Sequence, residues 1–335
     1  MIIDARGVAE GTRLDADVCI IGAGAAGITL ARELAGGPLD VCLLESGGLT
    51  PDARTQALYE GKNVGWPYYS LDALRLRFFG GTTNHWGGVC RPLDDIDFAA
   101  RSWVPSSGWP FGKAELDPYY RRAHEVCQLG PYDYDVAAIE DASRQRFHLD
   151  AARLETTMCQ YSPPTRFGQV YREALERAPN VRTYLYANAV DLVPVESGRA
   201  LSHVQAATLE GARFTVHARR FVLATGAIEN ARLLLASNGN RAGGLGNDHD
   251  LVGRFFMEHL SFPAGLLVPT MPGAAFKLYT QHSAMRGGHG FGQAHLSLPE
   301  AVLRRERLLN VRSWLPHARE LDALRGTSEG VESIF

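Results

Sequence analysis

The stretch Asp17–Gly48 constrains the fold more than any other part of this chain, because it holds a complete strand, turn, helix and strand pattern. Its apolar runs and glycines are Val18–Ile21, Gly22-x-Gly24-x-x-Gly27 and Val41–Leu44. Glycines at this spacing permit a tight turn, let backbone N–H groups approach a pyrophosphate at a helix N-terminus, and allow close helix packing. Glu45 follows Gly24 by 21 residues, close to the roughly 20 expected for an acid that binds a ribose hydroxyl. The pattern predicts a dinucleotide-binding βαβ unit, and the carboxylate disfavours a ligand with a 2′-phosphate.

The amino-acid composition excludes several other classes of protein. The 335 residues are 45% hydrophobic and 21% charged, which is ordinary globular material with enough length for two domains. The net charge of -3 gives no basic field, so nucleic acid is not an expected partner. Five scattered cysteines do not suggest a disulfide framework. The N-terminus lacks the apolar core of a secretory signal, and no apolar run reaches the roughly 18 residues of a membrane span. These features predict a cytoplasmic protein without a membrane span.

A second cofactor motif lies between residues 181 and 226. Here β-branched and aromatic runs, separated by a turn near Ser197, predict a small antiparallel meander. Its last run, Phe221–Ala224, ends in Ala224-Thr225-Gly226. This ending resembles the second cofactor motif of flavoproteins with two dinucleotide-binding domains, in which the strand around Ala189 and Val190 also borders the adenine. The resemblance favours FAD over NAD as the ligand.

The glycine-rich run GGTTNHWGG, residues 80–88, is the third informative feature. Together with segments 107–130, 224–237 and 251–260, it resembles the glucose-methanol-choline (GMC) oxidoreductases, in the branch of pyranose oxidase and the bacterial sugar dehydrogenases. Paired glycines let the main chain pass close to a flavin, while threonine and asparagine offer hydrogen bonds to its phosphate or ring. The residues expected to contact the flavin are Gly80, Gly81, Thr82, Thr83, Asn84, His85, Trp86, Gly87 and Gly88.

His85 raises the question of a covalent flavin. In several members of the family that this run resembles, the histidine that bonds to the flavin stands five residues after the first glycine, as His85 does after Gly80. One hypothesis is therefore that His85 carries the flavin covalently. The alternative is that it packs over the cofactor as a polar wall, and Trp86 fits either the core or the flavin side.

Other candidate residues favour plainer interpretations. His282, His289 and His295 are too loosely spaced for a metal site, and the glycines around them predict a mobile lid or substrate loop. Asp94, Asp95 and Asp97 alternate with apolar residues, which indicates the solvated side of a turn. Glu258–His259 lies in a family-like segment and is a candidate for the flavin region. No metal site is expected.

The resemblance implies an FAD-dependent oxidoreductase that oxidises a CH–OH group of a sugar, glycoside or polyol by hydride transfer to flavin. Related enzymes take the hydroxyl proton with a histidine, paired with a second histidine or asparagine, in the C-terminal part of a longer chain. The last histidine here, His317, has no such partner after it. We therefore name no catalytic base and expect a truncated product that lacks the closing segment.

The expected architecture is α/β. A three-layer, Rossmann-like FAD-binding domain with an antiparallel meander should span residues 14–260, with a crossover and flavin-facing segment at 50–130. Residues 261–335 should begin an α+β substrate-binding domain.

Two other functions stay open at this stage. The chain could be a catalytically incomplete FAD- or nucleotide-binding fragment, or a subunit completed by another chain or by oligomerisation. An NAD-dependent dehydrogenase is the third interpretation. The sequence predicts a small-molecule sugar or alcohol substrate and leaves the electron acceptor open, because oxygen reactivity depends on access and electrostatics around the flavin.

Overall fold

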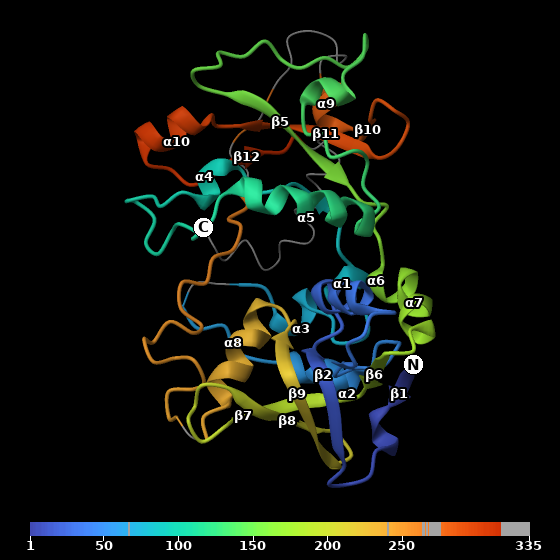
Figure 1. The fold of residues 1–335 in the computed structure, drawn as a ribbon. Coiled ribbons are helices and arrows are strands. Elements are labelled where there is room, and N and C mark those ends of the chain that lie inside the picture. Colours follow the sequence, from blue (N-terminus) through green and yellow to red (C-terminus); the bar gives the residue numbers. More distant parts are fainter. Residues whose placement is uncertain (66–67, 240, 263–264, 266, 268–275, 316–335) are drawn as a thin grey trace. The chain divides into compact units, whose positions relative to one another are not determined.

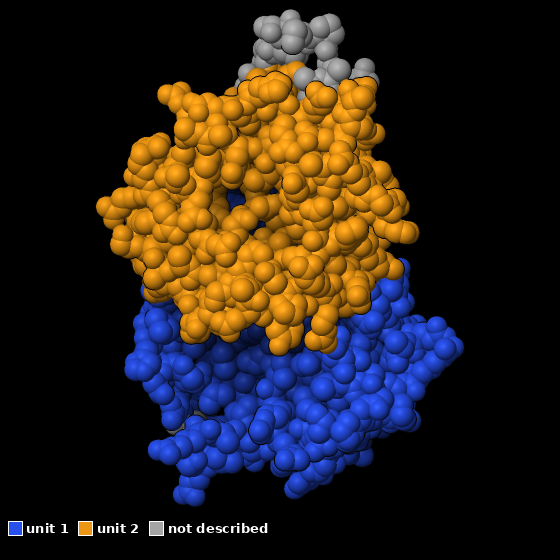
Figure 2. Space-filling view, turned by 45° about the horizontal axis from the view of Figure 1, so that its top comes forward, with its two compact units in different colours: residues 1–86, 166–262 blue, residues 87–165, 263–335 orange. Residues whose placement is uncertain are grey.

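The structure is a computed structural model that describes residues 1–65, 68–239, 241–262, 265, 267 and 276–315. The chain divides into two compact units, coloured separately in Figure 2. Unit 1 combines residues 1–86 with 166–262, and unit 2 combines residues 87–165 with 263–335. The sequence-based boundaries at 14–260 and 261–335 did not separate residues 87–165 from the first domain. Those residues belong to unit 2 because two of its strands lie within them.

Unit 1 is built on a seven-stranded sheet (Figure 1). In order across the sheet, its strands are β1 (Ile2–Asp4), β6 (Val181–Leu185), β3 (Val41–Leu44), β2 (Arg13–Ile21), β9 (Arg213–Leu223), β8 (Leu201–Ala207) and β7 (Asn188–Pro194). The first five of these strands are parallel to one another, and β9, β8 and β7 form an antiparallel meander.

The central strands form where the sequence is continuously apolar. All four residues of β3 and the last four of β2 are buried, as expected for parallel strands covered on both faces. Their core continues into the meander through buried residues such as Val204, Phe214 and Val216. The predicted α/β fold, with parallel strands at 18–21, 41–44 and 221–224 and a meander, is therefore confirmed.

One detail of the predicted meander was wrong. Residues 181–194 looked like one antiparallel stretch, but the chain divides there into β6, which pairs in parallel with β3, and β7. The reason is a turn between them at Tyr186, which has a φ of 57°. The meander also joins the parallel strands directly, because β9 pairs with β2 on one side and β8 on the other.

Short helices connect the strands of unit 1. They are η1 (Ala5–Gly7), α1 (Ala25–Leu34), α2 (Ala53–Gln56), η2 (Ala57–Tyr59), α3 (Leu71–Leu74), η3 (Gly81–Asn84), α6 (Phe167–Val170), α7 (Arg172–Arg177) and α8 (Ala227–Ala236). Helix α1 follows β2 and α8 follows β9, so two helices begin at the carboxyl ends of adjacent parallel strands.

Unit 2 has a smaller sheet of its own. Its strands run in the order β10 (Ser283–Ala284), β11 (Phe291–Ser297), β5 (Glu155–Tyr161) and β4 (Val89–Cys90), and β12 (Arg312–Ser313) also pairs with β11. Its helices are α4 (Asp95–Phe98), α5 (Lys113–Val126), η4 (Val136–Ile139), α9 (Lys277–Thr280) and α10 (Glu300–Glu306). A core around Met158, Leu278 and Ala294 packs against the sheet. Within the described ranges of either unit, no helix is both long and apolar enough to cross a membrane.

Candidate functional site

Two strand ends meet at the centre of the unit 1 sheet. The Ala224 N–H donates a hydrogen bond to the Ile21 carbonyl oxygen, at 2.8 Å, where β2 and β9 end. Gly22 follows with a φ of +100°, and a Cβ there would lie 2.7 Å from the Ala224 oxygen. Only glycine fits this turn, since both the backbone angle and the neighbouring strand exclude a side chain. The two motifs predicted from sequence, at 22–27 and 224–226, are therefore adjacent in space.

The other two glycines of the first motif have different structural roles. A Cβ on Gly27 would lie 1.9 Å from the Gly22 oxygen, so Gly27 lets α1 pack directly against the preceding turn. Gly24 caps α1, and a Cβ there would meet no atom within 4 Å. Gly24 therefore faces open space at the end of the helix where N–H groups and the helix dipole favour an anion.

Glu45 stands at the carboxyl end of β3, and 6% of its surface is exposed. Its Oε2 accepts from the Ala23 N–H (2.9 Å) and its Oε1 from the Gly47 N–H (2.8 Å). Burial raises the pKa of this carboxyl group, while these two hydrogen bonds and the charge of Arg77 act in the opposite direction. The side chain is thereby fixed beside the glycine turn, and each carboxylate oxygen keeps a further lone pair for a hydroxyl donor.

The glycine run at 80–88 packs onto this turn. The Gly80 N–H donates to the Ala23 carbonyl oxygen at 2.8 Å, and a Cβ on Gly81 would lie 3.1 Å from Gly24 Cα. Both glycines have positive φ, 96° and 55°. The close approach of the two backbones explains why glycine is needed here, and it brings the two predicted cofactor segments together.

Short polar side chains stabilise the run itself. Thr83 Oγ1 donates to the Gly80 carbonyl oxygen at 2.7 Å, and Asn84 Nδ2 donates to the carbonyl oxygens of Phe79 and Gly81, both at 3.0 Å. Sequence reasoning had assigned these side chains to the phosphate or ring of a cofactor. In the structure both side chains are hydrogen-bonded to the main chain, and they fix the shape of the glycine turn.

The neighbouring side chains of the run are more open. His85 is exposed, and its Nε2 lies 3.2 Å from the Leu74 carbonyl oxygen. Thr82 is also exposed, whereas Trp86 is partly buried and packs edge-on against Phe167 with ring centroids 6.3 Å apart. Of the two candidate roles of Trp86, packing within unit 1 is thus observed.

The last two glycines of the run lie in unit 2. Gly87 is exposed, and the Gly88 oxygen accepts a hydrogen bond from the Ser162 N–H at 2.8 Å. A Cβ on Gly88 would lie 2.8 Å from the Ser162 oxygen. Gly88 therefore has a role in packing unit 2.

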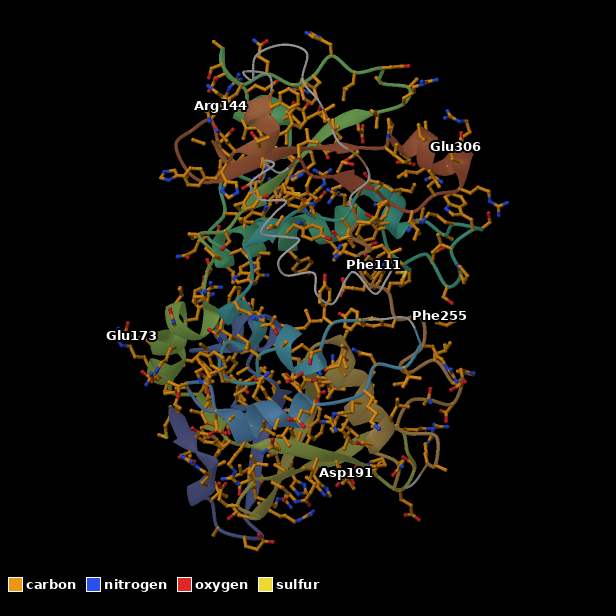
Figure 3. All side chains as sticks on the ribbon, turned by 180° about the vertical axis from the view of Figure 1, so that it is seen from behind. Phe111, Arg144, Glu173, Asp191, Phe255 and Glu306 are labelled. Carbon is orange, nitrogen blue, oxygen red and sulfur yellow. The ribbon has the colours of Figure 1, made fainter. Side chains whose placement is uncertain are left out.

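The segment that precedes β7 runs beside the end of β3. The Ala187 N–H donates to the Glu45 carbonyl oxygen at 2.8 Å, and Ala189 and Val190 follow after Asn188. The pairing register with β8 shifts between Ala189 and Asp191, which leaves Val190 at a bulge with 40% of its surface exposed. Asp191 is labelled in Figure 3.

Thr225 and Gly226 stand between β9 and α8. Thr225 donates through both its N–H and its hydroxyl to Asn230 Oδ1, at 3.1 and 2.6 Å. Gly226 caps α8 with a φ of +85°, and a Cβ there would meet no atom within 4 Å. The positive φ requires glycine, and the position opens onto free space as Gly24 does.

A buried cluster of charged side chains at this edge of the sheet was not predicted from the sequence. Glu229, in the first turn of α8, pairs with Arg75 (3.1 Å), Arg77 (3.3 Å) and Arg232 (2.8 Å). Burial would raise the pKa of Glu229, but these guanidinium groups hold it below its usual value. Arg77 also donates to Ser46 Oγ at 2.7 Å, beside Glu45. The pair of arginines just before the glycine run was the available sequence signal.

A small polar hollow of about 30 Å³ adjoins Ser46. Ser46 Oγ donates to Asn188 Oδ1 at 2.6 Å on its floor, and the Arg6 guanidinium lies 3.9 Å from the centre of the Tyr186 ring. The residues that line the hollow are Arg6, Ser46, Asp52, Arg54, Thr55, Tyr186, Asn188, Leu209 and Glu210. The hollow is formed by residues far apart in the sequence, so no local sequence motif predicts it.

The three loosely spaced histidines of unit 2 have separate surroundings. His295 is buried in β11 against Trp314, His282 packs on the Tyr161 ring, and His289 lies in the loop between β10 and β11. In the part of the chain that the structure describes, no three His, Cys, Asp or Glu side chains form a group suited to a metal.

Glu258–His259 lies in a coil of unit 1. Glu258 accepts a hydrogen bond from the Tyr68 hydroxyl at 2.8 Å, and the His259 side chain is fully exposed. Phe255, labelled in Figure 3, begins the same segment and is 60% exposed.

The chain belongs to the FAD dependent oxidoreductase family, whose model matches residues 17–242. FAD is the cofactor of that family, and the residues described above fit it. Gly24 and Gly226 keep space open at two helix N-termini, and Glu45 offers carboxylate oxygens for hydroxyls.

Curated relatives give the wider context. The chain is 29% identical over 297 residues to paromamine 6'-oxidase of Streptomyces fradiae, covering 73% of this chain and 54% of that protein. It is 27% identical over 305 residues to 6'''-hydroxyparomomycin C oxidase of Streptomyces lividus, with the same coverage. It is 25% identical over 321 residues to the fructose dehydrogenase large subunit of Gluconobacter japonicus, covering 73% and 59%. The chain thus spans little more than half the length of these relatives.

Among solved structures, the chain matches pyridoxine 4-oxidase from Mesorbium loti with a TM-score of 0.44 and 18% identity over 65% of this chain and 51% of that one. A formate oxidase matches with a TM-score of 0.42 and 16% identity over 68% and 48%.

Proposed function

We propose that this protein is a GMC-type oxidoreductase that oxidises a CH–OH group of a sugar, glycoside, aminoglycoside or polyol. The observation that carries the proposal is the meeting of three segments at one sheet edge. These segments are the glycine turn at 22–27, the run at 80–84 and the strand end at 224–226. The names of three curated relatives, two aminoglycoside oxidases and a fructose dehydrogenase, support the substrate class.

Each part of the edge has its own place in the proposed complex. The diphosphate of FAD lies at the N-terminus of α1 beside Gly24, where free N–H groups and the helix dipole stabilise it. The ribose hydroxyls donate to Glu45. The adenine lies against the side chains of Ser46 and Tyr186, which line one hollow together with Asn188, the residue before Ala189 and Val190. Bound FAD supplies the acceptor for the hydride that leaves the substrate carbon.

The run beginning at Gly80 faces the flavin in this proposal. Its turn is held rigid by Thr83 and Asn84, so Gly80 and Gly81 present backbone without a Cβ in the way. His85 and Thr82 supply exposed side chains on the same short segment. The base that takes the hydroxyl proton is not assigned to a residue of this chain.

Flavin reduction in the absence of oxygen tests the function. The purified protein is titrated anaerobically with fructose, with paromamine and with a matched amine that carries no oxidisable hydroxyl. We expect the visible flavin absorbance to bleach with a hydroxylated sugar and to stay unchanged with the control. Tight FAD binding without reduction by any of the sugars would contradict the catalytic proposal.

A second candidate function follows from the coverage of the relatives, of which this chain spans about half. In this alternative the chain is an FAD-binding subunit or fragment completed by another polypeptide. It is favoured if FAD binds and sugars reduce the flavin only after the partner chain is added. The same titration, repeated with a cell extract and then with purified partner fractions, separates the two functions.

A further inference from the structure

We propose that a pocket in unit 1 is a binding site for a small carboxylate that carries an apolar six-membered ring. The pocket has a volume of about 240 Å³. It is lined by the loop after β3, by residues in and just before η3, and by residues of α6 and α7. All these segments belong to unit 1, so the inference needs only the fold of that unit and does not rest on the proposed catalytic function.

The buried side of the pocket is fixed by contacts between backbones. The Phe79 N–H donates to the Gly48 carbonyl oxygen at 2.9 Å, one residue before Leu49. A Cβ on Gly168 would lie 2.3 Å from the Phe79 oxygen, so α6 packs directly against the chain at Phe79. The three segments that line the pocket are thus held together by the main chain, and the pocket belongs to the fold rather than to one side-chain rotamer.

The inner part of the lining is apolar, and its size limits the ligand. Phe79 is 2% exposed, and Leu49 and Phe78 are partly buried. A cavity of about 150 Å³ holds a benzene ring. The larger volume of this pocket therefore leaves room for a six-membered ring and one polar substituent.

Polar side chains stand at the mouth of the pocket. Gln169 and Arg172 line it and are exposed. Arg172 Nε donates to Glu176 Oε1 at 2.6 Å. Among the described residues, neither the two Nη atoms of Arg172 nor the side-chain amide of Gln169 has a hydrogen-bond partner. These donors are therefore available to a ligand that enters from solvent.

Arg172 sets the charge of the ligand. Of the described residues that line the pocket, it is the one that carries a charge. Its contact with Glu176 occupies Nε and orients the guanidinium plane, while the edge formed by the two Nη atoms suits both oxygens of a carboxylate. An ammonium group would be repelled there. An apolar interior with a single cation at the mouth therefore selects a ring with one carboxylate.

The pocket lies on the α6 side of the glycine run. A Cβ on Gly81 would lie 3.1 Å from Gly24 Cα, whereas a Cβ on Gly80 would lie 2.7 Å from the Gly168 nitrogen. The run thus contacts the turn before α1 through one glycine and α6 through the other. Figure 1 shows α6 and α7 beside α1. Since the pocket does not use the space at Gly24, we expect its ligand to bind while FAD is present.

The test measures binding of three ring compounds to the full chain saturated with FAD. Cyclohexanecarboxylate, cyclohexanecarboxamide and cyclohexylmethylamine share one ring and differ in charge. By titration calorimetry we expect the carboxylate to bind at one site with a Kd of about 1 mM, the scale for so small a ligand. The carboxamide should bind about 10-fold more weakly, because it loses the charge-assisted hydrogen bonds, and the amine should not bind. Equal affinities of carboxylate and carboxamide, or binding of the carboxylate only after FAD is removed, would overturn the proposal.

Variants of α7 locate the carboxylate. Arg172→Met should weaken binding about 10-fold. Arg177→Met is the matched control, because Arg177 pairs with Glu173 on the same helix and does not line the pocket. Glu173 is labelled in Figure 3. Glu176→Gln removes the competing carboxylate and should strengthen binding. Unchanged binding in Arg172→Met, or an equal loss in Arg177→Met, would show that the carboxylate does not bind at Arg172.

Glucuronate separates an apolar ring from a hydroxylated one. It presents the same carboxylate on a six-membered ring with hydroxyl groups, which Leu49 and Phe78 do not favour. Tighter binding of glucuronate than of cyclohexanecarboxylate would overturn the assignment of an apolar ring. Gln169→Trp places a large side chain at the exposed mouth and should block the carboxylate without a change of charge. Full binding by that variant would place the ligand outside this pocket.

Discussion

Gly24 and Gly27 are three residues apart, yet the structure gives them opposite roles, and alanine at each position separates cofactor binding from folding. A Cβ on Gly27 would lie 1.9 Å from the Gly22 oxygen and 3.4 Å from Ile20 Cγ2. Since the obstructing atom is backbone, α1 must move away from β2. We expect Gly27→Ala to lower the free energy of unfolding by about 3 kcal/mol, the upper part of the range for overpacked sites.

Gly24→Ala should behave differently. Its φ of −82° suits alanine, and the added Cβ meets no protein atom within 4 Å. The weaker helix cap and the stiffer unfolded chain nearly offset each other, so the change in unfolding free energy should stay within about 1 kcal/mol. The methyl group instead occupies the space proposed for the diphosphate. Losing one charge-assisted hydrogen bond there would weaken FAD binding by about 10- to 100-fold.

The assay compares two quantities for both variants. Urea unfolding of flavin-free protein gives the stability, and a flavin fluorescence titration gives the FAD affinity. If Gly24→Ala binds FAD as tightly as the unaltered protein, the diphosphate does not lie at the N-terminus of α1. Equal destabilisation by the two variants would also refute the argument, because Gly24 would then be a packing residue.

Three further predictions concern buried charge and the flavin. Glu229→Gln should cost about 3 kcal/mol in urea unfolding, because it leaves the guanidinium groups of Arg75 and Arg77 without their buried counter-charge; a loss below about 0.5 kcal/mol would contradict this. The pKa of Glu229 is lowered on folding, so its contribution is present above the usual value of 4.5 and disappears as pH falls through the folded pKa. The contribution of Glu45 to stability depends on pH in the opposite direction. Burial raises the pKa of Glu45, so this contribution is present below pH 4.5 and is lost as the pH rises through the folded pKa. The stability of the unaltered protein relative to Glu45→Gln, measured by urea unfolding, should therefore decline as the pH rises above 4.5, and a rise would show that the hydrogen bonds outweigh burial. If His85 carries the flavin covalently, acid precipitation should leave the yellow colour in the pellet, and His85→Ala should release it; colour released from the unaltered protein would rule out the bond.

The glycine turn could be predicted from sequence because its physics is local. Val18–Ile21 and Val41–Leu44 are continuous apolar runs, and the three glycines between them have one compatible geometry. Each therefore appears where expected, and β9 joins them as the motif ending in Gly226 indicated.

The parts that were missed depend on contacts between distant residues. The sequence of residues 181–194 does not indicate that β6 pairs with β3. That pairing depends on backbone hydrogen bonds between distant segments, such as the one from the Glu45 N–H to the Tyr184 carbonyl oxygen at 2.8 Å. The ion cluster likewise joins Arg75 and Arg77 to Glu229, more than 150 residues later. A pattern read along the chain carries no signal for such pairs.

The division into two units differs from the predicted domain boundaries for a similar reason. Residues 87–165 follow the glycine run without a linker, and sequence reasoning kept their first part with the cofactor domain. In the structure β4 pairs with β5, and β5 pairs with β11, whose residues lie at least 130 positions later in the chain. Three aspartates nearby, interpreted as the solvated side of a turn, include Asp94 and Asp97, which form a capping box at α4.

The most direct test of the central claim is the nucleotide content of the purified protein. Its visible spectrum, together with chromatography of the nucleotide released or retained after denaturation, gives the identity and the amount per chain. The account predicts one FAD per chain, bound at the edge formed by Gly24, Glu45 and Gly80. A protein without flavin that fails to bind added FAD, but binds NAD, would contradict it.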